Sequence, residues 1–272
     1  MSTTPSTTVK PEQPTPAYVP GHDLLAGRVV VVTAAAGAGI GAAVARKVLE
    51  EGCRAVVISD THERRLAESH RLLAEEFGAD RVASIACNVT QEADVVALFD
   101  AAEPFGGVDV LINNAGLGGT NDILEMPDET WNLVLDVTLT GTMRCIREAG
   151  RRFVAAGKRG VIVNNSSVIG WRAQEGQAHY AAAKAGVKAL TRSAAADLAA
   201  YGIRVNAVSP SLAMHPFLEK VTSPELLVEL KGREAFGRAA APWEIANVMV
   251  FLASDYSSYM TGEVLAVSSQ HA

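Results

Sequence analysis

The stretch VVTAAAGAGIGAAVA, residues 31–45, decides the fold of this chain. It could form either an alanine-rich helix whose small residues merely pack or a strand that enters a phosphate-binding turn. Gly37, Gly39 and Gly41 lie close together, and each glycine inside a helix costs about 1 kcal/mol relative to alanine. We therefore predict a strand at VVVVT (29–33), a turn at AAAGAGIG (34–41) and a helix at AAVARKVLEEG (42–52).

Short β-branched runs alternate with helix-length amphipathic segments along the rest of the chain. The further predicted strands are RAVVIS (54–59), RVASIAC (81–87), VDVLIN (108–113), GVIVNNS (160–166), IRVNAVS (203–209) and EVLAV (263–267). Strands that are apolar on both sides and separated by helices predict a parallel sheet covered on both faces. With right-handed crossovers this is a doubly wound α/β sheet, a Rossmann fold, whose ligands bind beyond the carboxyl ends of the strands.

The domain organisation follows from composition along the chain. We expect one domain over residues 23–272, with a substrate lid near 211–232. Residues 1–22 are rich in Pro, Ser and Thr and are predicted to form a disordered tail.

Composition and charge argue against several functional classes. The chain is 49% hydrophobic and 20% charged, with a net charge of -6 and no basic patch, so we expect no nucleic-acid or membrane partner. Cys53, Cys87 and Cys145 form no CxxC pair, which gives no support for a metal site or a disulfide framework. Without a signal peptide or a membrane-spanning segment, the expected location is the cytoplasm.

The glycine-rich turn precedes a helix N-terminus, where free N–H groups and a partial positive charge suit a pyrophosphate. Asp60 ends the next predicted strand, 19 residues after Gly41, at the usual place for an acid that binds the adenosine ribose. A carboxylate accepts hydrogen bonds from the 2'-hydroxyl of NAD and repels the 2'-phosphate of NADP, so NAD is favoured. Arg64 and Arg65 follow closely, but they lie in a helix whose charges are typical of a solvated face.

The candidate catalytic residues are Ser167, Tyr180 and Lys184, which stand 13 and 4 residues apart. Positions four apart share one face of a helix, so Lys184 is expected beside Tyr180. A tyrosine hydroxyl titrates near 10, but an adjacent ammonium and a positively charged nicotinamide both stabilise its phenolate. Tyr180 is thereby predicted to exchange protons with a substrate.

With these residues, the chain resembles the short-chain dehydrogenase/reductase family. The resemblance runs from about Gly27 to Gln270 and includes NNAG (113–116), YAAAK (180–184), RVNAVSP (204–210) and FLASDYSSYMTGEVLAV (251–267). It implies that Tyr180 is the acid/base, that Ser167 orients the substrate oxygen, and that Lys184 binds the nicotinamide ribose and tunes the tyrosine. It further implies hydride transfer between nicotinamide C4 and a carbinol or carbonyl carbon, and a homotetramer.

The same resemblance implies a set of cofactor-binding residues. They are Thr33, Ala35, Gly37, Gly39, Ile40, Gly41, Asp60, Asn88, Val89, Asn114, Ala115, Gly116, Tyr180, Lys184, Pro210, Leu212 and His215.

Several positions depart from the family pattern. The turn is one residue longer than usual, with Ala34 and Ala35 where a glycine is expected, and Asn88 replaces a common aspartate. His215 stands for a threonine that contacts the carboxamide. Thr138 replaces an asparagine credited with holding a water in a proton relay; a threonine hydroxyl can bond a water but lacks the amide's reach.

The substrate is expected to be a bulky, apolar alcohol or ketone. The predicted pocket contains Ser167, Trp171, Met214 and Phe217. A narrower resemblance links GWRAQ (170–174), HYAAAKAGV (179–187), SPSLAMHPFLEK (209–220) and EAFGRAAAPWE (234–244) to family members that act on CoA-linked fragments of the steroid C and D rings. Arg172 and Lys220 are then candidates for contacts with the CoA.

Two alternatives stay open. One is a 3-oxoacyl thioester reductase, which normally uses NADPH and a linear chain; Asp60 argues against it. The other is a cofactor-binding regulatory protein that has lost turnover, which Thr138 leaves open and which the presence of Ser167, Tyr180 and Lys184 opposes.

Overall fold

The computed structural model describes residues 12–214 and 224–270. Its centre is a seven-stranded sheet in the order β3-β2-β1-β4-β5-β6-β7, with every neighbouring pair parallel. The strands are β1 (Val29–Val32), β2 (Ala55–Asp60), β3 (Val82–Ala86), β4 (Val110–Asn113), β5 (Val161–Asn165), β6 (Arg204–Pro210) and β7 (Val264–Val267). All seven predicted strands and the doubly wound architecture are confirmed. The strand order reverses between β1 and β4, and such a switch point is where ligands of these sheets bind.

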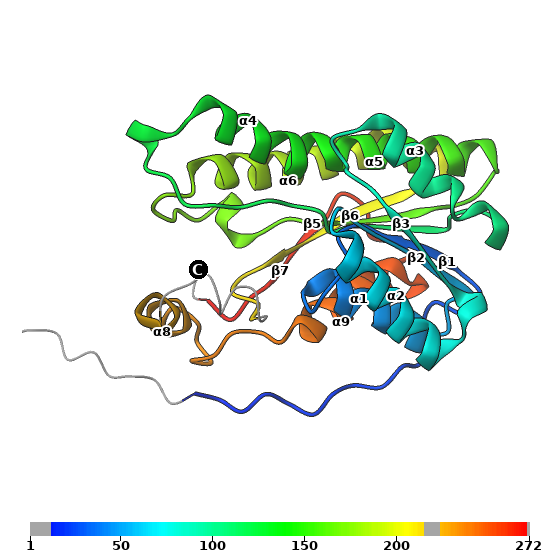
Figure 1. The fold of residues 1–272 in the computed structure, drawn as a ribbon, viewed down its shortest axis with the longest axis horizontal. Helices are drawn as coiled ribbons and strands as arrows, with labels where there is room; N and C mark the ends of the chain where they lie inside the picture. Colours follow the sequence, from blue (N-terminus) through cyan, green and yellow to red (C-terminus); the bar gives the residue numbers. More distant parts are fainter. Residues whose placement is uncertain (1–11, 215–223, 271–272) are drawn as a thin grey trace, which may run out of the picture.

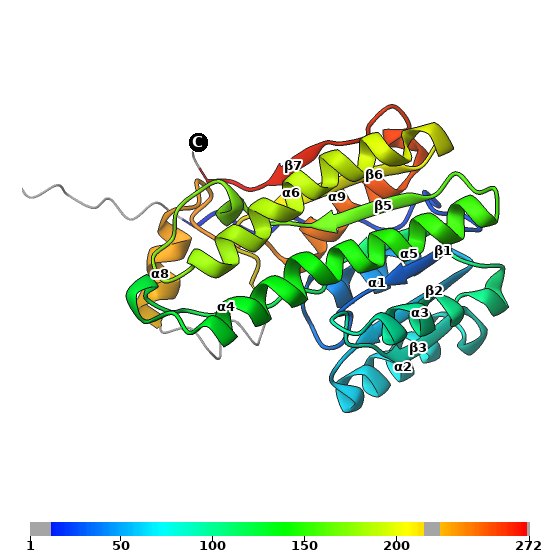
Figure 2. The ribbon, with the colours of Figure 1, turned by 90° about the horizontal axis from the view of Figure 1, so that it is seen from above.

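Helices cover both faces of the sheet (Figure 1). One layer holds α1 (Ile40–Glu50), α2 (Glu63–Phe77) and α9 (Pro242–Ala253). The other holds α3 (Glu92–Asp100), α4 (Asp128–Leu135), α5 (Gly141–Ala155) and α6 (Ala178–Leu198). A short helix, α8 (Pro224–Gly232), lies at one end of the molecule (Figure 1 and Figure 2).

Each face of the sheet builds its own core because side chains alternate along a strand. In β1, Val30 and Val32 pack with α1 and α9, whereas Val29 and Val31 pack with α3 and α5. All four valines are buried to 1% exposure or less, so β1 is a central strand that takes part in both cores.

A π-helical turn, Asp136–Thr140, joins α4 to α5. Such turns widen the helix locally and are frequent near functional sites. Thr138 lies inside this turn and is fully buried.

The N-terminal arm, residues 12–22, contains no helix or strand but lies on the body of the protein. The buried ammonium of Lys47 on α1 donates to the carbonyl of Val19 at 2.7 Å. The Tyr18 hydroxyl donates to Glu50, and its ring packs edge-on against Trp243 of α9 with 5.3 Å between ring centroids. These contacts fall where a disordered tail is expected over residues 1–22; residues 1–11 lie outside the described part of the chain.

Over residues 12–214 and 224–270, no helix combines the length and the hydropathy that a bilayer crossing requires.

Candidate active site

Three residues from two neighbouring segments meet at the carboxyl end of β5. Ser167 follows β5 and caps the short 3-10 helix η5 (Val168–Gly170), where its Oγ accepts the Ile169 N–H at 3.3 Å. Tyr180 and Lys184 lie one turn apart on α6, with the Lys184 Nζ 5.6 Å from the centre of the Tyr180 ring. The structure therefore brings together the three residues predicted to carry the chemistry.

The Lys184 side chain is buried and fixed in position. Its Nζ donates to the backbone carbonyl of Asn165 at 2.5 Å, and the side chain is 3% exposed. Burial, and then the nearby charge of Lys188, lower the pKa of Lys184 to about 8. The ammonium is still mostly protonated at neutral pH, so it supplies a positive charge beside Tyr180.

The environment of Tyr180 shifts its pKa in the opposite direction from that of Lys184. Burial raises the pKa of its hydroxyl, and hydrogen bonding from the Ser167 side chain partly offsets this rise. The protein alone therefore keeps the phenol protonated at neutral pH. Further positive charge, such as an oxidised nicotinamide carries, is needed to make it a base.

The backbone conformation and close packing of the glycine-rich turn explain why it consists of small residues. Ala34 takes a left-handed conformation with φ of 52°, at a position where the family pattern has a glycine, and Gly37 has φ of 87°. At Gly41, a Cβ would lie 2.3 Å from the carbonyl oxygen of Ala34 and 2.5 Å from the amide nitrogen of Asn114. Gly41 thus allows α1 to pack against the turn, while Ala34 adopts a backbone shape that ordinarily favours glycine.

The start of α1 is open to an anion. Its N-cap residue, Gly39, has no side chain, so no side chain at this position accepts a hydrogen bond from the first N–H groups of the helix. Gly39, Ile40 and Gly41 line a cleft of about 360 Å³, so the helix N-terminus, whose first N–H groups have no partner within the helix, lies at its wall. The cleft is lined by Ala34, Gly39, Ile40, Gly41, Asn114, Gly116, Asn165, Ser211, Leu212 and Ala213. This chemistry fits the phosphates of a dinucleotide.

Asp60 ends β2 at the edge of the same turn. Its Oδ2 accepts the Ala36 N–H at 3.2 Å, and its Oδ1 accepts the His62 N–H at 2.9 Å. Each carboxylate oxygen keeps further acceptor capacity. The carboxylate is therefore oriented by the backbone and can still accept hydrogen bonds from a ribose.

A chain of amide side chains connects the turn to Lys184. Thr33 Oγ1 accepts the N–H groups of Asn114 and Ala115, both at 2.9 Å. The Asn114 side chain donates to the carbonyl of Ala34 at 2.9 Å and accepts from Asn165 Nδ2 at 2.9 Å. The carbonyl of Asn165 in turn holds Lys184. Asn165 is absent from the predicted site, although its position at the end of a predicted strand is the signal that could have indicated it.

Asn88 and Val89 lie in the loop after β3. Asn88 Oδ1 accepts from both the N–H and the hydroxyl of Thr90, so its oxygen stabilises its own turn. Val89 is buried against Gly141, where a Cβ would approach its Cγ2 to 2.6 Å. Pro210, the last residue of β6, pairs with Val267 in the sheet.

Thr138 uses its hydroxyl to hold the loop after β4. Its Oγ1 accepts the Leu117 N–H at 3.0 Å and donates to the Leu117 carbonyl at 3.2 Å. Gly116 lies between Thr138 and Lys184: a Cβ there would be 3.2 Å from Lys184 Nζ and 3.8 Å from Thr138 Cγ2. In this arrangement the hydroxyl is already bonded to Leu117.

A second cavity of about 210 Å³ opens beside Ser167 and shares Ser211 and Leu212 with the cleft. It is more polar than predicted, because its lining includes Arg172, Arg233 and three glutamines. The full lining is Ser167, Val168, Ile169, Arg172, Ala173, Gln174, Gln177, Ser211, Leu212, Leu230, Arg233 and Gln270. The two cavities meet at Ser211 and Leu212, and Ser167 lines the second one.

Of the four residues predicted to form the substrate pocket, the structure places Ser167 in the lining of this cavity. Trp171 is 48% exposed and is absent from the described lining of this cavity, because its ring covers the ammonium of Lys188. The Met214 N–H donates to the Ala240 carbonyl at 2.9 Å. His215, Phe217 and Lys220 lie outside the described residues.

Glu234, which the sequence analysis does not single out, joins three segments around this cavity. It is 1% exposed and accepts the Leu212 N–H at 3.3 Å, the Ser269 hydroxyl at 2.7 Å and the Gln270 amide at 3.0 Å. The other end of the Gln270 amide accepts from Arg172 at 2.5 Å. Close by, Ala213 and Ala240 form a β-bridge, so the chain leaving β6 and the chain returning from α8 are held together.

Comparison with known proteins shows that the chain is similar to reductases and dehydrogenases. A family model described as enoyl-(acyl carrier protein) reductase matches residues 34–269. The (5R,7aS)-5-hydroxy-7a-methyl-1-oxo-2,3,5,6,7,7a-hexahydro-1H-indene-carboxyl-CoA reductase of Mycobacterium tuberculosis is 58% identical over 94% of this chain and 97% of that protein. The cis-4-hydroxycyclohexanecarboxylate dehydrogenase of Sinomonas cyclohexanicum is 43% identical over 90% of this chain and 96% of that protein. The crystal structure of a short chain dehydrogenase from Mycobacterium smegmatis superimposes with a TM-score of 0.84 at 53% identity, covering 95% of this chain and 99% of the other.

Proposed function

The chain belongs to the short-chain dehydrogenase/reductase family and is an oxidoreductase, and on that basis we propose that it transfers hydride between NAD(H) and a ring alcohol or ketone on a CoA-linked steroid fragment. The carrying observation is that two adjoining cavities, which share Ser211 and Leu212, border the three predicted residues. Ser167, the hydrogen-bond partner of Tyr180, lines the 210 Å³ cavity, and Asn165, whose carbonyl holds Lys184, lines the 360 Å³ cleft. A dinucleotide in the cleft and a substrate in the cavity would then lie next to each other, with the substrate beside Ser167 and its hydrogen-bond partner Tyr180.

The proposed roles follow from the atoms that this site presents. In the reductive direction, the Tyr180 hydroxyl gives its proton to the substrate oxygen while the Ser167 hydroxyl donates a hydrogen bond to the same oxygen. In the oxidative direction, Tyr180 accepts the proton of the alcohol. Lys184 holds a positive charge beside Tyr180 in both directions. A bound nicotinamide supplies or accepts the hydride.

We assign NAD rather than NADP as the cofactor. The support is Asp60, whose carboxylate is oriented by two backbone N–H groups at the edge of the glycine-rich turn. The residues from Thr33 to Gly41, together with Asn114, Gly116 and Leu212, are proposed to bind the dinucleotide. A charge of the same sign as a 2'-phosphate disfavours NADP at this position.

The substrate proposal rests on the relatives and on the polar cavity. The M. tuberculosis relative is named as a reductase of a bicyclic CoA compound, and the S. cyclohexanicum relative as a dehydrogenase of a cyclic hydroxy acid. Arg172 and Arg233 line the cavity. Arg233 is paired with Glu229 at 2.6 Å, whereas Arg172 donates to the neutral amide of Gln270 and so gives the cavity positive charge suited to an acyl-CoA or a carboxylate. A linear 3-oxoacyl thioester reductase using NADPH is the weaker alternative, because Asp60 opposes the phosphate. The presence of all three catalytic side chains in one place opposes a regulatory protein without turnover.

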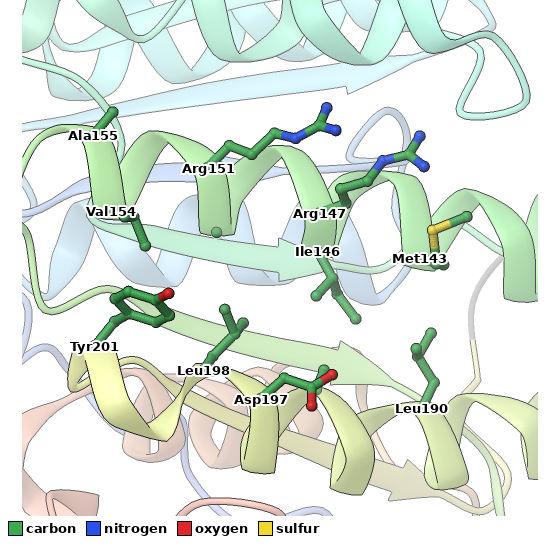
Figure 3. A pocket seen from close by; sticks show the side chains of 12 residues that line it. Met143, Ile146, Arg147, Arg151, Val154, Ala155, Leu190, Asp197, Leu198 and Tyr201 are labelled. Atoms are coloured by element: carbon green, nitrogen blue, oxygen red, sulfur yellow. The ribbon is translucent and has the colours of Figure 1, made fainter.

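We further propose a homotetramer in the cytoplasm. An apolar groove of about 560 Å³ runs between α5 and α6. Ile146 points toward α6, and Leu190 and Leu198 point toward α5 (Figure 3). At its end Val154 is 43% exposed and Tyr201 55% exposed. Exposed apolar side chains of this kind are typical of an interface between subunits, and sedimentation showing only a monomer would contradict the proposal.

The test is a steady-state screen with NAD(H) and NADP(H). Hydroxy and keto hydrindane carboxyl-CoA thioesters are compared with linear 3-oxoacyl thioesters. We expect the bicyclic compounds with NAD(H) to give the highest kcat/KM. Preference for a linear thioester with NADPH would overturn the assignment, and binding of NADH without turnover of either class would favour the regulatory alternative.

A further inference from the structure

Lys188, one helical turn after Lys184 on α6, occupies an unusual environment. Its side chain is 4% exposed, and its Nζ has no hydrogen-bond acceptor among the residues that the structure describes. A buried ammonium without an acceptor is unfavourable and requires compensation. Because Lys184 and Lys188 are four residues apart, they lie on the same face of the helix.

The compensation comes from an aromatic ring. The Nζ of Lys188 lies 3.2 Å from the centre of the Trp171 ring, well inside the range of cation–π attraction. With half of its surface exposed, Trp171 shields the ammonium from solvent. The contact explains both why a lysine is tolerated here and why the tryptophan lies outside the cavity lining.

Trp171 belongs to the same tight turn as the catalytic serine. The Gly170 N–H donates to the Ser167 carbonyl at 3.1 Å, and the Trp171 N–H donates to the Val168 carbonyl at 3.0 Å. At Gly170, a Cβ would lie 2.9 Å from the backbone nitrogen of Ala185 and 2.9 Å from Lys188 Nζ. The serine turn therefore packs directly on the backbone of α6, with the Lys188–Trp171 contact at its end.

We propose that Lys188 is a positioning residue for this reaction: by holding Trp171, it fixes the Ser167 turn against the helix that carries Tyr180, and it places a second positive charge behind Lys184. This inference rests on the proposed function, because it assumes that Ser167 and Tyr180 act on one substrate oxygen. The two residues of the contact act through others and need not touch the substrate.

The charges around Lys188 are all positive among the described residues that influence it. Burial, followed by Arg192 on the same helix and Arg172 after η5, lowers the pKa of Lys188 to about 8. Lys188 in turn lowers the pKa of Lys184. The ammonium is thus present at neutral pH and is lost as the pH rises through about 8, which weakens its contact with Trp171 and its effect on Lys184.

The experiment compares Lys188→Met, which keeps the apolar stem, with Lys188→Arg, which keeps the charge. Alcohol oxidation is measured with NAD and the hydroxy hydrindane carboxyl-CoA compound. We expect Lys188→Met to lower kcat about tenfold with the KM for NAD unchanged. The lower apparent pKa of the kcat/KM profile should rise by roughly half a unit to one unit, because the Tyr180 phenolate loses a stabilising charge. Lys188→Arg should recover most of kcat. Arg192→Met is the charge control: it removes a nearby cation but keeps Lys188 on the Trp171 ring, so kcat should stay near the wild-type value while the pKa of Lys188 rises, because Arg192 helps to lower it.

Two further variants and a spectroscopic readout keep the test independent of folding and of substrate identity. Trp171→Phe retains a ring and should resemble the wild type, whereas Trp171→Leu should resemble Lys188→Met. The intrinsic fluorescence of the wild type should change with a midpoint near pH 8, and this change should be absent from Lys188→Met and Trp171→Leu. Identical kcat, pH profile and fluorescence titration in wild type and Lys188→Met would overturn the inference. Tyr180→Phe separates the two proposals: turnover that survives in that variant contradicts the proposed function, whereas an inactive Tyr180→Phe beside an unaffected Lys188→Met contradicts only the role of Lys188.

Discussion

Replacing Asp60 by Asn removes one negative charge from the end of β2 while keeping the size of the side chain. In the protein its two oxygens accept the Ala36 and His62 N–H groups at 3.2 and 2.9 Å. An amide keeps only one oxygen, so one of these bonds is lost and the group that faces a ribose is less well oriented. The change should therefore weaken NAD binding and, at the same time, relieve the repulsion of NADP.

The two effects can be given approximate sizes. A hydrogen bond to a charged group contributes about 1.5–3 kcal/mol, which NAD would lose in part or in full. Two unit charges about 5 Å apart at an effective dielectric constant of about 20 repel by about 3 kcal/mol, and the partial exposure of Asp60 reduces this by roughly half. The combined change of about 3–4 kcal/mol corresponds to a shift of roughly a hundredfold to a thousandfold in the ratio of catalytic efficiencies for NAD and NADP.

The assay is kcat/KM for both cofactors with one alcohol at saturating concentration. Glu63→Gln is the control, because it removes an exposed carboxylate three residues after Asp60, at the first position of α2. We expect that control to leave the ratio within about twofold. A folded Asp60→Asn enzyme with the wild-type ratio would refute the role of this carboxylate in cofactor choice.

The remaining predictions concern Tyr180, Thr138 and Ala34. Tyr180→Phe should reduce kcat by at least about a thousandfold while the Kd of NADH, measured by fluorescence, stays within about twofold, since only the proton-transfer group is removed; substantial residual turnover would exclude the acid/base role. Thr138→Val should lower the free energy of unfolding by about 1–3 kcal/mol in urea denaturation, because the N–H and carbonyl of Leu117 lose their partner. Thr138→Asn should change the rate or its pH dependence if a proton relay operates, and an identical profile would remove Thr138 from the catalytic set. Ala34→Gly should raise the free energy of unfolding by about 0.5–1 kcal/mol because φ of 52° strains an alanine; a less stable variant would show that no strain is relieved.

Much of the fold was predictable because its signals are local. The five central strands are short runs that are mostly buried on both faces, and the edge strands β3 and β7 are partly buried. The glycine-rich turn combines a strand, close backbone approaches and a helix start within a dozen residues. The relative positions of the candidate catalytic residues were predictable for the same reason. Ser167 follows the end of a predicted strand, and Tyr180 and Lys184 are one helical turn apart on the same face of a helix. These features depend on neighbours in the sequence.

What could not be predicted depends on contacts between distant segments. The burial of Glu234 is possible because its carboxylate accepts hydrogen bonds from Leu212, Ser269 and Gln270, which come from two other parts of the chain. Lys188 resembles a surface lysine until Trp171 is placed on its ammonium. Thr138 lies in a π-helical turn whose extra residue changes the helical phase, so helical spacing does not show that its hydroxyl reaches Leu117. No periodicity or spacing carries this information.

The chain between Leu212 and Glu234 has consequences for redesign. Its two ends are already fastened to each other, by the Leu212–Glu234 hydrogen bond at 3.3 Å and by the Ala240 N–H donating to the Leu212 carbonyl at 2.8 Å. A loop from a relative, inserted between Leu212 and Glu234, would join two points that the rest of the protein already holds close together. The entropic cost of closing such a loop is therefore small. Chimaeras that keep Leu212, Glu234 and Ala240 should therefore keep the rest of the fold intact, and the segment between these anchors can be exchanged as one unit to test whether it sets substrate selectivity.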